Sequence, residues 1–509
     1  MFNLLKNLIT NKEKKEIAKL IKTNPETLEA FENAYKKNLI ETPDDNNLFG
    51  ISAKQIANNR PQNNSNNQNY NKLVEKYIEK IVDELLVNLK VYHYSCENHH
   101  ENHHENHHEN HHENHHENHH ENHHENHHEN PKKLLETPLT VEEINKLPEK
   151  LRPQLTGSLY SVDLKDEMPS KQLLVNYKKY LESTDPKAKK EFYNRFRQGL
   201  DILDLDNIIY QMLEQNPNAI GYWLPKITKA VEKENFFKIP ETTIIKVPLP
   251  LLQLTRKDYS SLTSTSLKIA DKFCQKAFKL NPQKKYFIKT GTFSSKFDFR
   301  NAKIENPKEV MEIGQYLIFI QNQAVLMAGS VFMKDIPNKG PVLAKAPSIY
   351  GASTTNEWCV REYIEDKENC PTIYKGLPLH TEYRAFVDFD TKKLLAIHQY
   401  WDEEVMQKRF NQSPDSNTPD MLHDAIIFES HKEKLKENYE NYKELVKEKL
   451  EDILQGINLK GQWSVDIMQN GDEFWLIDMA LAQNSAFYEY VPKELRNPSS
   501  ENWIPEKIK

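Results

Sequence analysis

The stretch GQWSVDIMQNGDEFWLIDMALAQNSAFYEY, residues 461–490, most constrains what this chain can fold into. Two runs rich in β-branched and aromatic residues flank the turn signal at 469–472, Gln-Asn-Gly-Asp, so the stretch predicts a β-hairpin. Each run carries one aspartate, Asp466 or Asp478, where an ordinary strand would carry an apolar residue. Because side chains alternate along a strand, the other face is predicted to be an apolar wall. That wall comprises Trp463, Val465, Ile467, Trp475, Ile477 and Met479.

The length of the turn decides whether the two aspartates share a face of the hairpin. A two-residue Asn-Gly loop would pair Met468 with Glu473 and place Asp466 and Asp478 on opposite faces. A loop of three or five residues would keep them on one face. We expect the longer loop, because two carboxylates on a rigid hairpin suit Mg²⁺, which prefers oxygen ligands. The alternative is an ordinary hairpin with two solvated aspartates.

The length and charge of the chain limit the classes of function. At 509 residues the chain is long enough for two or three domains with a sizeable core. The formal net charge is -7, but an ENHH repeat at 97–130 contributes nine glutamates, and the rest of the chain carries +2. So small a charge predicts neither a nucleic-acid partner nor a membrane partner.

The cysteines and the N-terminal residues allow a prediction of the cellular compartment in which the protein is found. The four cysteines, Cys96, Cys274, Cys359 and Cys370, show no paired-ligand spacing, which favours a reducing compartment over disulfides or a zinc site. The start of the chain, MFNLLKNLITNKEKK, has too short an apolar core for a signal peptide, and no run approaches membrane-spanning length. We therefore expect a cytoplasmic protein.

The sequence divides into four regions. Residues 1–95 are predicted to be a helical accessory region, and residues 132–235 are mostly polar and helical in pattern. Between them, residues 96–131 form a linker that is predicted to be disordered, because the ENHH repeat has no apolar side chain to bury. Residues 236–509 mix strands and helices without a regular βαβ period, which indicates the α+β class.

The ENHH repeat allows two interpretations. Its sixteen histidines, arranged in pairs, would bind Zn²⁺, Ni²⁺ or Cu²⁺ in a test tube, because neutral imidazole is a common ligand for these ions. A metal-buffering protein is therefore one functional hypothesis. The alternative, which we favour, is a short repeat that expanded into a tolerated linker.

Two further segments carry residues suited to phosphate chemistry. Lys289 ends a predicted strand, 286–289, just before the loop TGTFSSK, where an ammonium group beside backbone donors suits a phosphate. In the predicted strand 382–389 the alternation puts Glu382 and Arg384 on one face, and arginine stabilises the charge of a transferring phosphate. The alternatives are a surface lysine before a turn and a salt-bridged outer sheet face.

These segments occur in the order of the ATP-grasp fold, and residues 236–495 resemble that superfamily. The sequences EYRAFV at 382–387 and IHQ at 397–399 resemble motifs of the branch that contains a eukaryotic cell-division-cycle chaperone, which assembles translation initiation factor two. WSVDIMQNGDEFWLIDM resembles the final metal-binding hairpin of that branch. FIKTGTFSSKFDF and LHTEYRAFVDFDTKK resemble uncharacterised bacterial and phage ATP-grasp proteins.

The resemblance implies ATP and Mg²⁺ as cofactors and assigns a role to each matching residue. Lys289 would hold the ATP phosphates, with Ser294 and Ser295 in the loop that closes over them. The backbone of 362–364, Glu362, Tyr363 and Ile364, would read the adenine edge. Glu382 would bind the ribose hydroxyls, Arg384 the γ-phosphate, and Asp466 and Asp478 the Mg²⁺.

One position departs from the family pattern, which usually places an asparagine two residues after the last acidic ligand. Here Ala480 occupies that place, and Asn484 could substitute as a metal ligand only if the backbone bulges. The function implied is that of an ATP-grasp ligase, in which Lys289 and Arg384 serve catalysis while ATP activates a carboxylate for attack by an amine or another nucleophile. The alternative is a non-enzymatic ATP-binding chaperone or assembly factor. The acceptor, a small molecule or a protein, is not specified by the sequence.

Overall fold

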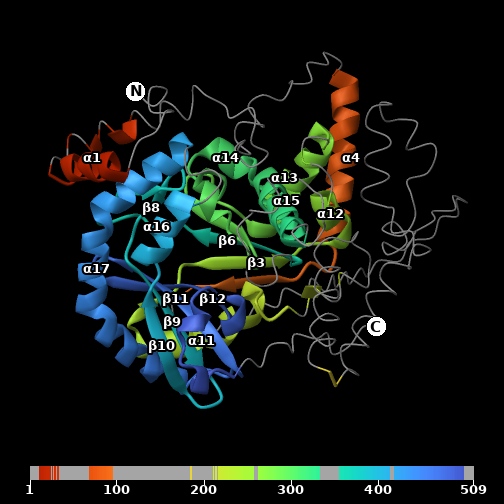
Figure 1. The fold of residues 1–509 in the computed structure, drawn as a ribbon. Coiled ribbons are helices and arrows are strands. Elements are labelled where there is room, and N and C mark those ends of the chain that lie inside the picture. The colour runs from red at the N-terminus through yellow and green to blue at the C-terminus, as the bar shows by residue number, and fades with distance from the viewer. Residues whose placement is uncertain are drawn as a thin grey trace, which may run out of the picture.

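The fold combines two five-stranded sheets with helices on their outer sides (Figure 1). The computed structural model describes residues 11–23, 26, 28–29, 31–33, 68–95, 184–185, 210, 213–214, 216–256, 259, 262–332, 355–412 and 418–497. A membrane-spanning helix is not found among these residues, because none of their helices combines sufficient length with sufficient apolar character. The ENHH tract lies outside the described residues, and so does the predicted helical region from 132 to 209 except for residues 184–185.

The first sheet is antiparallel throughout, with strand order β1-β3-β6-β4-β5. Its strands are β1 (Val91–Tyr94), β3 (Thr242–Lys246), β6 (Glu357–Glu362), β4 (Tyr286–Thr290) and β5 (Lys303–Ile304). The strand from the N-terminal region, β1, therefore pairs with a strand more than a hundred residues further along the chain.

The second sheet has the order β10-β9-β11-β12-β2, and only the short edge strand β2 runs parallel to its neighbour. Its strands are β10 (Lys393–Gln399), β9 (Glu382–Asp388), β11 (Gln462–Asn470), β12 (Glu473–Leu481) and β2 (Phe237–Lys238). A two-stranded ribbon, β7 (Thr372–Ile373) and β8 (Leu377–Pro378), stands apart from both sheets. This mixture of helices and mainly antiparallel sheets confirms the predicted α+β class.

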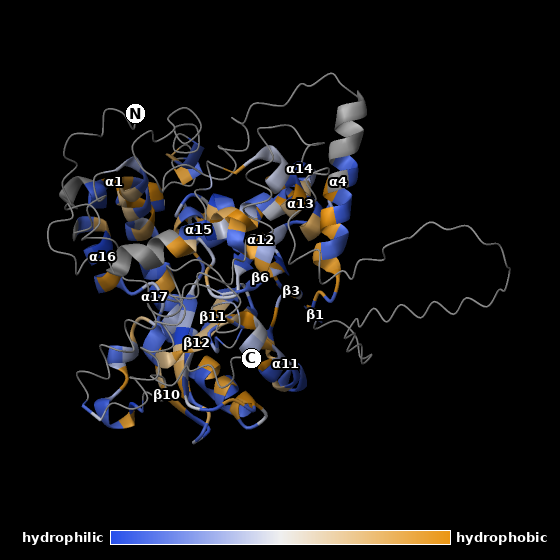
Figure 2. Ribbon diagram, turned by 90° about the vertical axis from the view of Figure 1, so that its right-hand side faces the viewer, coloured by the Kyte–Doolittle hydropathy of each residue, from blue (hydrophilic) through white to orange (hydrophobic). Residues whose placement is uncertain are grey.

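Helices cover the two sheets on different sides. Apolar residues of α4, α12, α13 and α15 share one core with the first sheet, and those of α11 and α17 share a second core with the other sheet. Figure 2 shows both hydrophobic and hydrophilic residues on α4 and α11, as expected of helices that bury one side. The α-helices are α1 (Asn11–Thr23), α4 (Gln68–Leu86), α11 (Ile220–Glu234), α12 (Leu249–Gln253), α13 (Ser264–Phe278), α14 (Pro307–Met311), α15 (Ile313–Phe332), α16 (Glu403–Gln412) and α17 (Pro419–Leu454). The 3-10 helices are η2 (Leu254–Arg256), η4 (Lys296–Asn301), η7 (Ala482–Asn484), η8 (Tyr488–Tyr490) and η9 (Lys493–Leu495).

Strand alternation explains why one face of the first sheet meets helices and the other meets the second sheet. On β6, Trp358 belongs to the helix-covered core, whereas Cys359 belongs to the core shared with the second sheet. On β4, Ile288 belongs to the helix-covered core. The next residue, Lys289, is the register partner of Cys359. The side chain of Lys289 therefore faces the second sheet.

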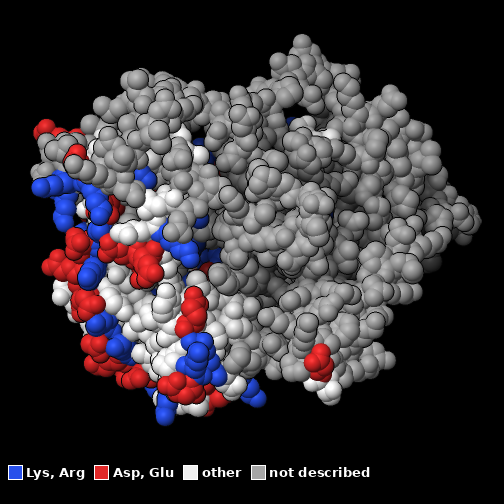
Figure 3. Space-filling model, viewed as in Figure 1, with Lys and Arg blue, Asp and Glu red and all other residues white. Residues whose placement is uncertain are grey.

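The long helix α17 begins earlier than its apolar stripe indicates. In the sequence, apolar residues at helical spacing predict a helix over 431–455, and these residues are Leu435, Tyr439, Tyr442, Val446, Leu450 and Ile453. The helix instead starts at Pro419, with Thr418 as the capping residue that accepts the Met421 N–H. The first turns carry buried polar residues, His423 and Asp424, which hide the amphipathic pattern. Farther along, the exposed face carries acidic and basic side chains side by side (Figure 3).

Candidate functional site

The hairpin of β11 and β12 brings the two aspartates together, but by a route that we did not predict. The predicted loop of three or five residues is wrong: Asn470 pairs with Glu473, so the loop has only two residues. Gly471 has φ +65°, and the first position of a type II′ turn favours glycine for that reason. Asp466 nevertheless pairs with Asp478.

A β-bulge in β12 restores the register that the short loop would otherwise lose. Ile467 pairs with Leu476, while the next residue back, Asp466, pairs with Asp478, so Ile477 has no partner on β11. One extra residue on one strand shifts the alternation by one position. Asp478 therefore lies opposite Asp466 on the same face of the sheet.

Because of the short loop and the bulge, the apolar face of β12 is made of other residues than we predicted. Trp475 and Ile477 are not buried, whereas Phe474 and Leu476 are 3% and 1% exposed. Between the two-residue loop and the bulge, the even-numbered residues of β12 face the core. Beyond the bulge the odd-numbered residues face the core, so Met479 is buried as predicted. The prediction is also confirmed for the buried residues of β11, which are Trp463, Val465 and Ile467.

Arg361, on β6 of the first sheet, holds the bulge in place. Its Nη1 donates a hydrogen bond to the carbonyl oxygen of Ile477 at 2.5 Å, and its Nε donates to Thr242 Oγ1 at 3.1 Å. The arginine is 3% exposed. The sequence analysis did not identify Arg361, although a charged residue inside an otherwise apolar strand was a signal for it. Arg361 links the two sheets beside Asp478.

Two ion pairs join cationic and acidic residues between and within the sheets. Lys289 Nζ, on the first sheet, donates to both carboxylate oxygens of Asp478 at 3.0 Å, and the lysine side chain is only 2% exposed. Arg384 makes a bidentate pair with Asp466, with Nε–Oδ1 and Nη2–Oδ2 distances of 2.8 and 2.6 Å. Arg384 and Asp466 have side chains that are 12% and 11% exposed. Four of the predicted site residues therefore lie in one cluster.

Glu382 and Lys296 belong to the same charged cluster. The ammonium of Lys296 contacts the Tyr400 hydroxyl, and the guanidinium of Arg384 lies 4.6 Å from the Tyr400 ring centroid. Burial, together with the nearby charge of Arg384, lowers the pKa of Lys296, and burial raises the pKa of Glu382. The sequence analysis did not identify Lys296, although it ends the loop TGTFSSK that was singled out.

The raised pKa of Glu382 predicts a pH dependence of stability. A carboxyl group whose pKa rises above 4.5 on folding stabilises the folded state fully below that pH, and this contribution is lost as pH rises through the raised pKa. The glutamine side chain of the Glu382→Gln variant stays neutral at every pH, so the variant does not lose this contribution to stability. Urea unfolding at a series of pH values should therefore show the variant gaining stability relative to wild type above pH 4.5. If the free energies of unfolding of the two proteins changed with pH in the same way, the carboxyl group of Glu382 would not be buried in its protonated form.

The backbone of the predicted adenine-reading segment is partly engaged within the first sheet. The N–H groups of Glu362 and Tyr363 donate to the carbonyl oxygens of Glu241 and Lys285 at 2.8 and 3.2 Å. The Glu362 side chain is 49% exposed and lies 3.6 Å from Lys284. The N–H groups of two of the three predicted residues are therefore already paired within the sheet.

The remaining predicted residues have other hydrogen-bond partners. Ser295 is 4% exposed, and its hydroxyl donates to Gln323 Oε1 at 2.7 Å, whereas Ser294 is only half-buried. Asn484 Oδ1 accepts a hydrogen bond from Asn218 Nδ2 at 3.1 Å. Asn218 in turn accepts the Leu481 N–H, so it holds the end of β12. The structure therefore brings Asn484 to Asn218 and shows no direct contact with either aspartate.

Comparison with known proteins gives a distant structural likeness. No family model matches the chain, and no curated protein matches it significantly. Two solved structures of Cdc123 from Schizosaccharomyces pombe, one of them C-terminally truncated, are 17% and 16% identical to this chain. Each match covers 59% of this chain and 94% of the Cdc123 chain, with a TM-score of 0.30. At this level of likeness, the function has to be inferred from the residues of the site.

Proposed function

We propose that this chain is an ATP-grasp protein that binds Mg-ATP between its two sheets and uses it to activate a carboxylate for attack by an amine or another nucleophile. One observation carries the proposal. The residues that the sequence resemblance assigns to phosphate and metal are brought together from separate strands of both sheets. Lys289 comes from β4, Arg384 from β9, Asp466 from β11 and Asp478 from β12.

The proposed roles follow from charge and position. Lys289 and Arg384 would hold the ATP phosphates, and Glu382 would accept hydrogen bonds from the ribose hydroxyls once it is ionised. Lys296 adds a third cation, placed at the end of the loop that the resemblance assigns to the phosphates. Catalysis by such a site rests on positioning the reactants and neutralising the charge of the transferring phosphate.

The acidic residues fit a magnesium ion in their chemistry. Asp466 and Asp478 offer carboxylate oxygens from directly opposed positions, and Mg²⁺ prefers such ligands together with substrate phosphates. Each carboxylate is bonded to a cationic side chain, Arg384 or Lys289. An ATP phosphate would offer those cations another anionic partner, so we infer that nucleotide binding frees the carboxylates for the metal. Magnesium would neutralise charge on the phosphates.

A second candidate function is nucleotide binding without turnover, as in an assembly factor. The observation in its favour concerns the third metal ligand. Ala480 occupies the position where the family usually has asparagine, and the side chain of Asn484 is hydrogen-bonded to Asn218. Two carboxylates alone would hold the metal more weakly than a complete set of ligands. Such a site could bind Mg-ATP without releasing ADP.

Incubation of the purified chain with Mg-ATP and a pool of cell metabolites should separate the two candidates. ADP release that depends on an added acceptor supports the ligase, and ATP binding without ADP release supports the assembly factor. Lys289→Ala should mainly weaken ATP binding, and Arg384→Ala should mainly lower turnover. Lys443→Ala, which removes the exposed ion pair with Glu440 on α17, is the matched control and should change neither ATP binding nor turnover. Wild-type behaviour of all three variants would contradict both candidates.

A further inference from the structure

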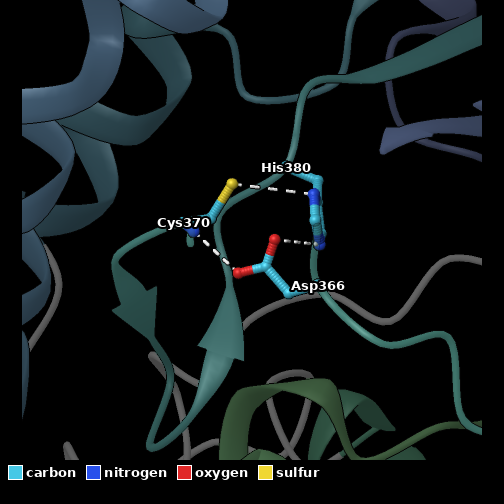
Figure 4. Close-up of side chains that lie close together, drawn as sticks. All are labelled: Asp366, Cys370 and His380. Atoms are coloured by element: carbon cyan, nitrogen blue, oxygen red, sulfur yellow. Dashed lines mark hydrogen bonds and ion pairs between the residues drawn. The ribbon is translucent and has the colours of Figure 1, made fainter. Parts of the chain in front are cut away.

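A second group of reactive side chains lies on the segment that joins β6 to β9. Asp366, Cys370 and His380 each offer one potential ligand atom, and these atoms all lie within 4.8 Å of one another. Figure 4 shows their side chains pointing toward a common centre. Cys370 is 8% exposed and His380 is 3% exposed, so the group is largely shielded from solvent. None of the three belongs to the proposed nucleotide site.

The spacing of the ligand atoms allows a single metal ion. One ring nitrogen of His380, the sulfur of Cys370 and one carboxylate oxygen of Asp366 lie within 4.8 Å of one another, and Cys370 Sγ is 3.6 Å from His380 Nδ1. Ligands of a tetrahedral zinc ion, with bonds of about 2.0 to 2.3 Å, lie roughly 3.5 Å apart, so the three atoms would move slightly closer together around the ion. A fourth oxygen is close by, because Glu368 Oε2 is 3.8 Å from the same sulfur.

The charges of the group favour a cation at its centre. Two carboxylates, Asp366 and Glu368, lie beside a thiol, and the cation recorded near them in the described residues is Lys434, 3.2 Å from Glu368. A divalent cation at the centre would offset the charge of both carboxylates, because buried charges in proteins are paired or coordinate metals.

We propose that Cys370, His380 and Asp366 bind a zinc ion, with Glu368 as the fourth ligand. The metal would take the place of the thiol proton, so that atoms and charge balance: Cys370 binds as thiolate and one proton is released. Glu368 would leave Lys434 to coordinate with Oε2. The chemistry of one thiolate, one imidazole and two carboxylates, with all four positions filled by protein, is that of a structural site.

Such an ion would fasten the loop 366–370 to the segment just before β9, and hydrogen bonds connect the same loop to the hairpin of the nucleotide site. Glu368 Oε1 accepts the N–H of Gly471 at 2.7 Å, and Asn470 Oδ1 accepts the N–H of Lys367 at 2.9 Å. The loop 366–370 is thereby attached to the turn of the β11–β12 hairpin. His380 lies two residues before Glu382, at the start of β9. The four proposed zinc ligands are separate from the nucleotide-binding residues, so zinc binding can be tested without a nucleotide.

Titration of the full chain with Co²⁺, after removal of metal with a chelator, tests this site. Cobalt bound to a thiolate gives a charge-transfer absorption band that histidine ligands do not give. The ENHH tract contains no cysteine, although Cys96 directly precedes it. We expect wild type and Cys96→Ser to show the band, and excess Zn²⁺ to remove it. Cys370→Ser should lose the band, and Asp366→Asn should weaken Co²⁺ binding about tenfold or more.

Two outcomes would overturn the proposal. One is the absence of a thiolate band in wild type, and the other is a band that is lost in Cys96→Ser and kept in Cys370→Ser. If Cys370→Ser does not fold, alkylation of the wild-type chain decides the question. Excess Zn²⁺ should then slow the alkylation of Cys370 and leave that of Cys274, a buried cysteine outside the group, unchanged. Equal rates for Cys370 with and without Zn²⁺ would contradict the site.

Discussion

Replacing Arg384 with methionine is expected to lower the free energy of unfolding by about 3 to 5 kcal/mol, the cost of breaking a buried ion pair by removing one partner. Arg384 makes two short hydrogen bonds to Asp466, and both side chains are mostly buried. Without the guanidinium, the carboxylate of Asp466 would lose both of these hydrogen bonds while it stays mostly buried. Urea denaturation followed by circular dichroism measures the loss.

A double-mutant cycle separates the pair from its surroundings. Arg384→Met combined with Asp466→Asn should lose less stability than the sum of the single variants, because the double variant leaves no unpaired buried charge at this pair. Lys443→Met, which breaks an exposed pair with Glu440, should cost less than about 1 kcal/mol. Additive losses, or a cost for Arg384→Met as small as that of the exposed pair, would contradict the buried cluster.

Replacing Arg361 with methionine should destabilise the fold by about 3 kcal/mol and weaken Mg-ATP binding tenfold or more. Two hydrogen bonds from a charged, buried donor would be lost, each worth about 1.5 to 3 kcal/mol. The carbonyl oxygen of Ile477 would lose this donor, and Ile477 is the bulged residue that places Asp478 on the face of the proposed site. Arg361 would therefore act through Asp478, as a positioning residue, without touching the nucleotide.

Deletion of Ile477 distinguishes positioning from a general loss of stability. Without the extra residue, Leu476 still pairs with Ile467, and Asp478 follows directly opposite Asp466 in a regular register. In the Arg361→Met background this deletion should restore part of the Mg-ATP affinity. Full affinity in Arg361→Met alone, or no recovery of affinity when Ile477 is deleted in that background, would show that Arg361 does not act by holding the bulge.

The sequence predicted those parts of the fold that depend on local pattern. Alternation along the strand 382–389 correctly placed Arg384 on the face opposite the buried residues Tyr383, Ala385 and Val387. The turn dipeptide Asn470-Gly471 indicated the length of the loop correctly, but the loop consists of Gly471 and Asp472, so Met468 pairs with Trp475 where an Asn-Gly loop would pair it with Glu473. A single-residue bulge compensates for that loop, and no local pattern reveals a bulge in β12.

The residues that the sequence could not reveal act between distant segments. Lys289 and Asp478 are 189 positions apart, so their pairing depends on how two sheets stack. Arg361 and Asn218 were missed for the same reason, because each holds the end or the bulge of β12 from another part of the chain. Pairwise contacts of this kind follow from tertiary packing, which periodicity along one chain does not encode.

Titration calorimetry with Mg-ATP tests the central claim most directly. The wild-type chain should bind one equivalent of nucleotide with an affinity that falls when Mg²⁺ is replaced by a chelator. Asp478→Asn should lose the magnesium dependence, and Lys289→Met should lose most of the affinity, while circular dichroism shows both variants folded. No binding by wild type, or the same magnesium-dependent binding in all three proteins, would contradict a nucleotide site between the two sheets.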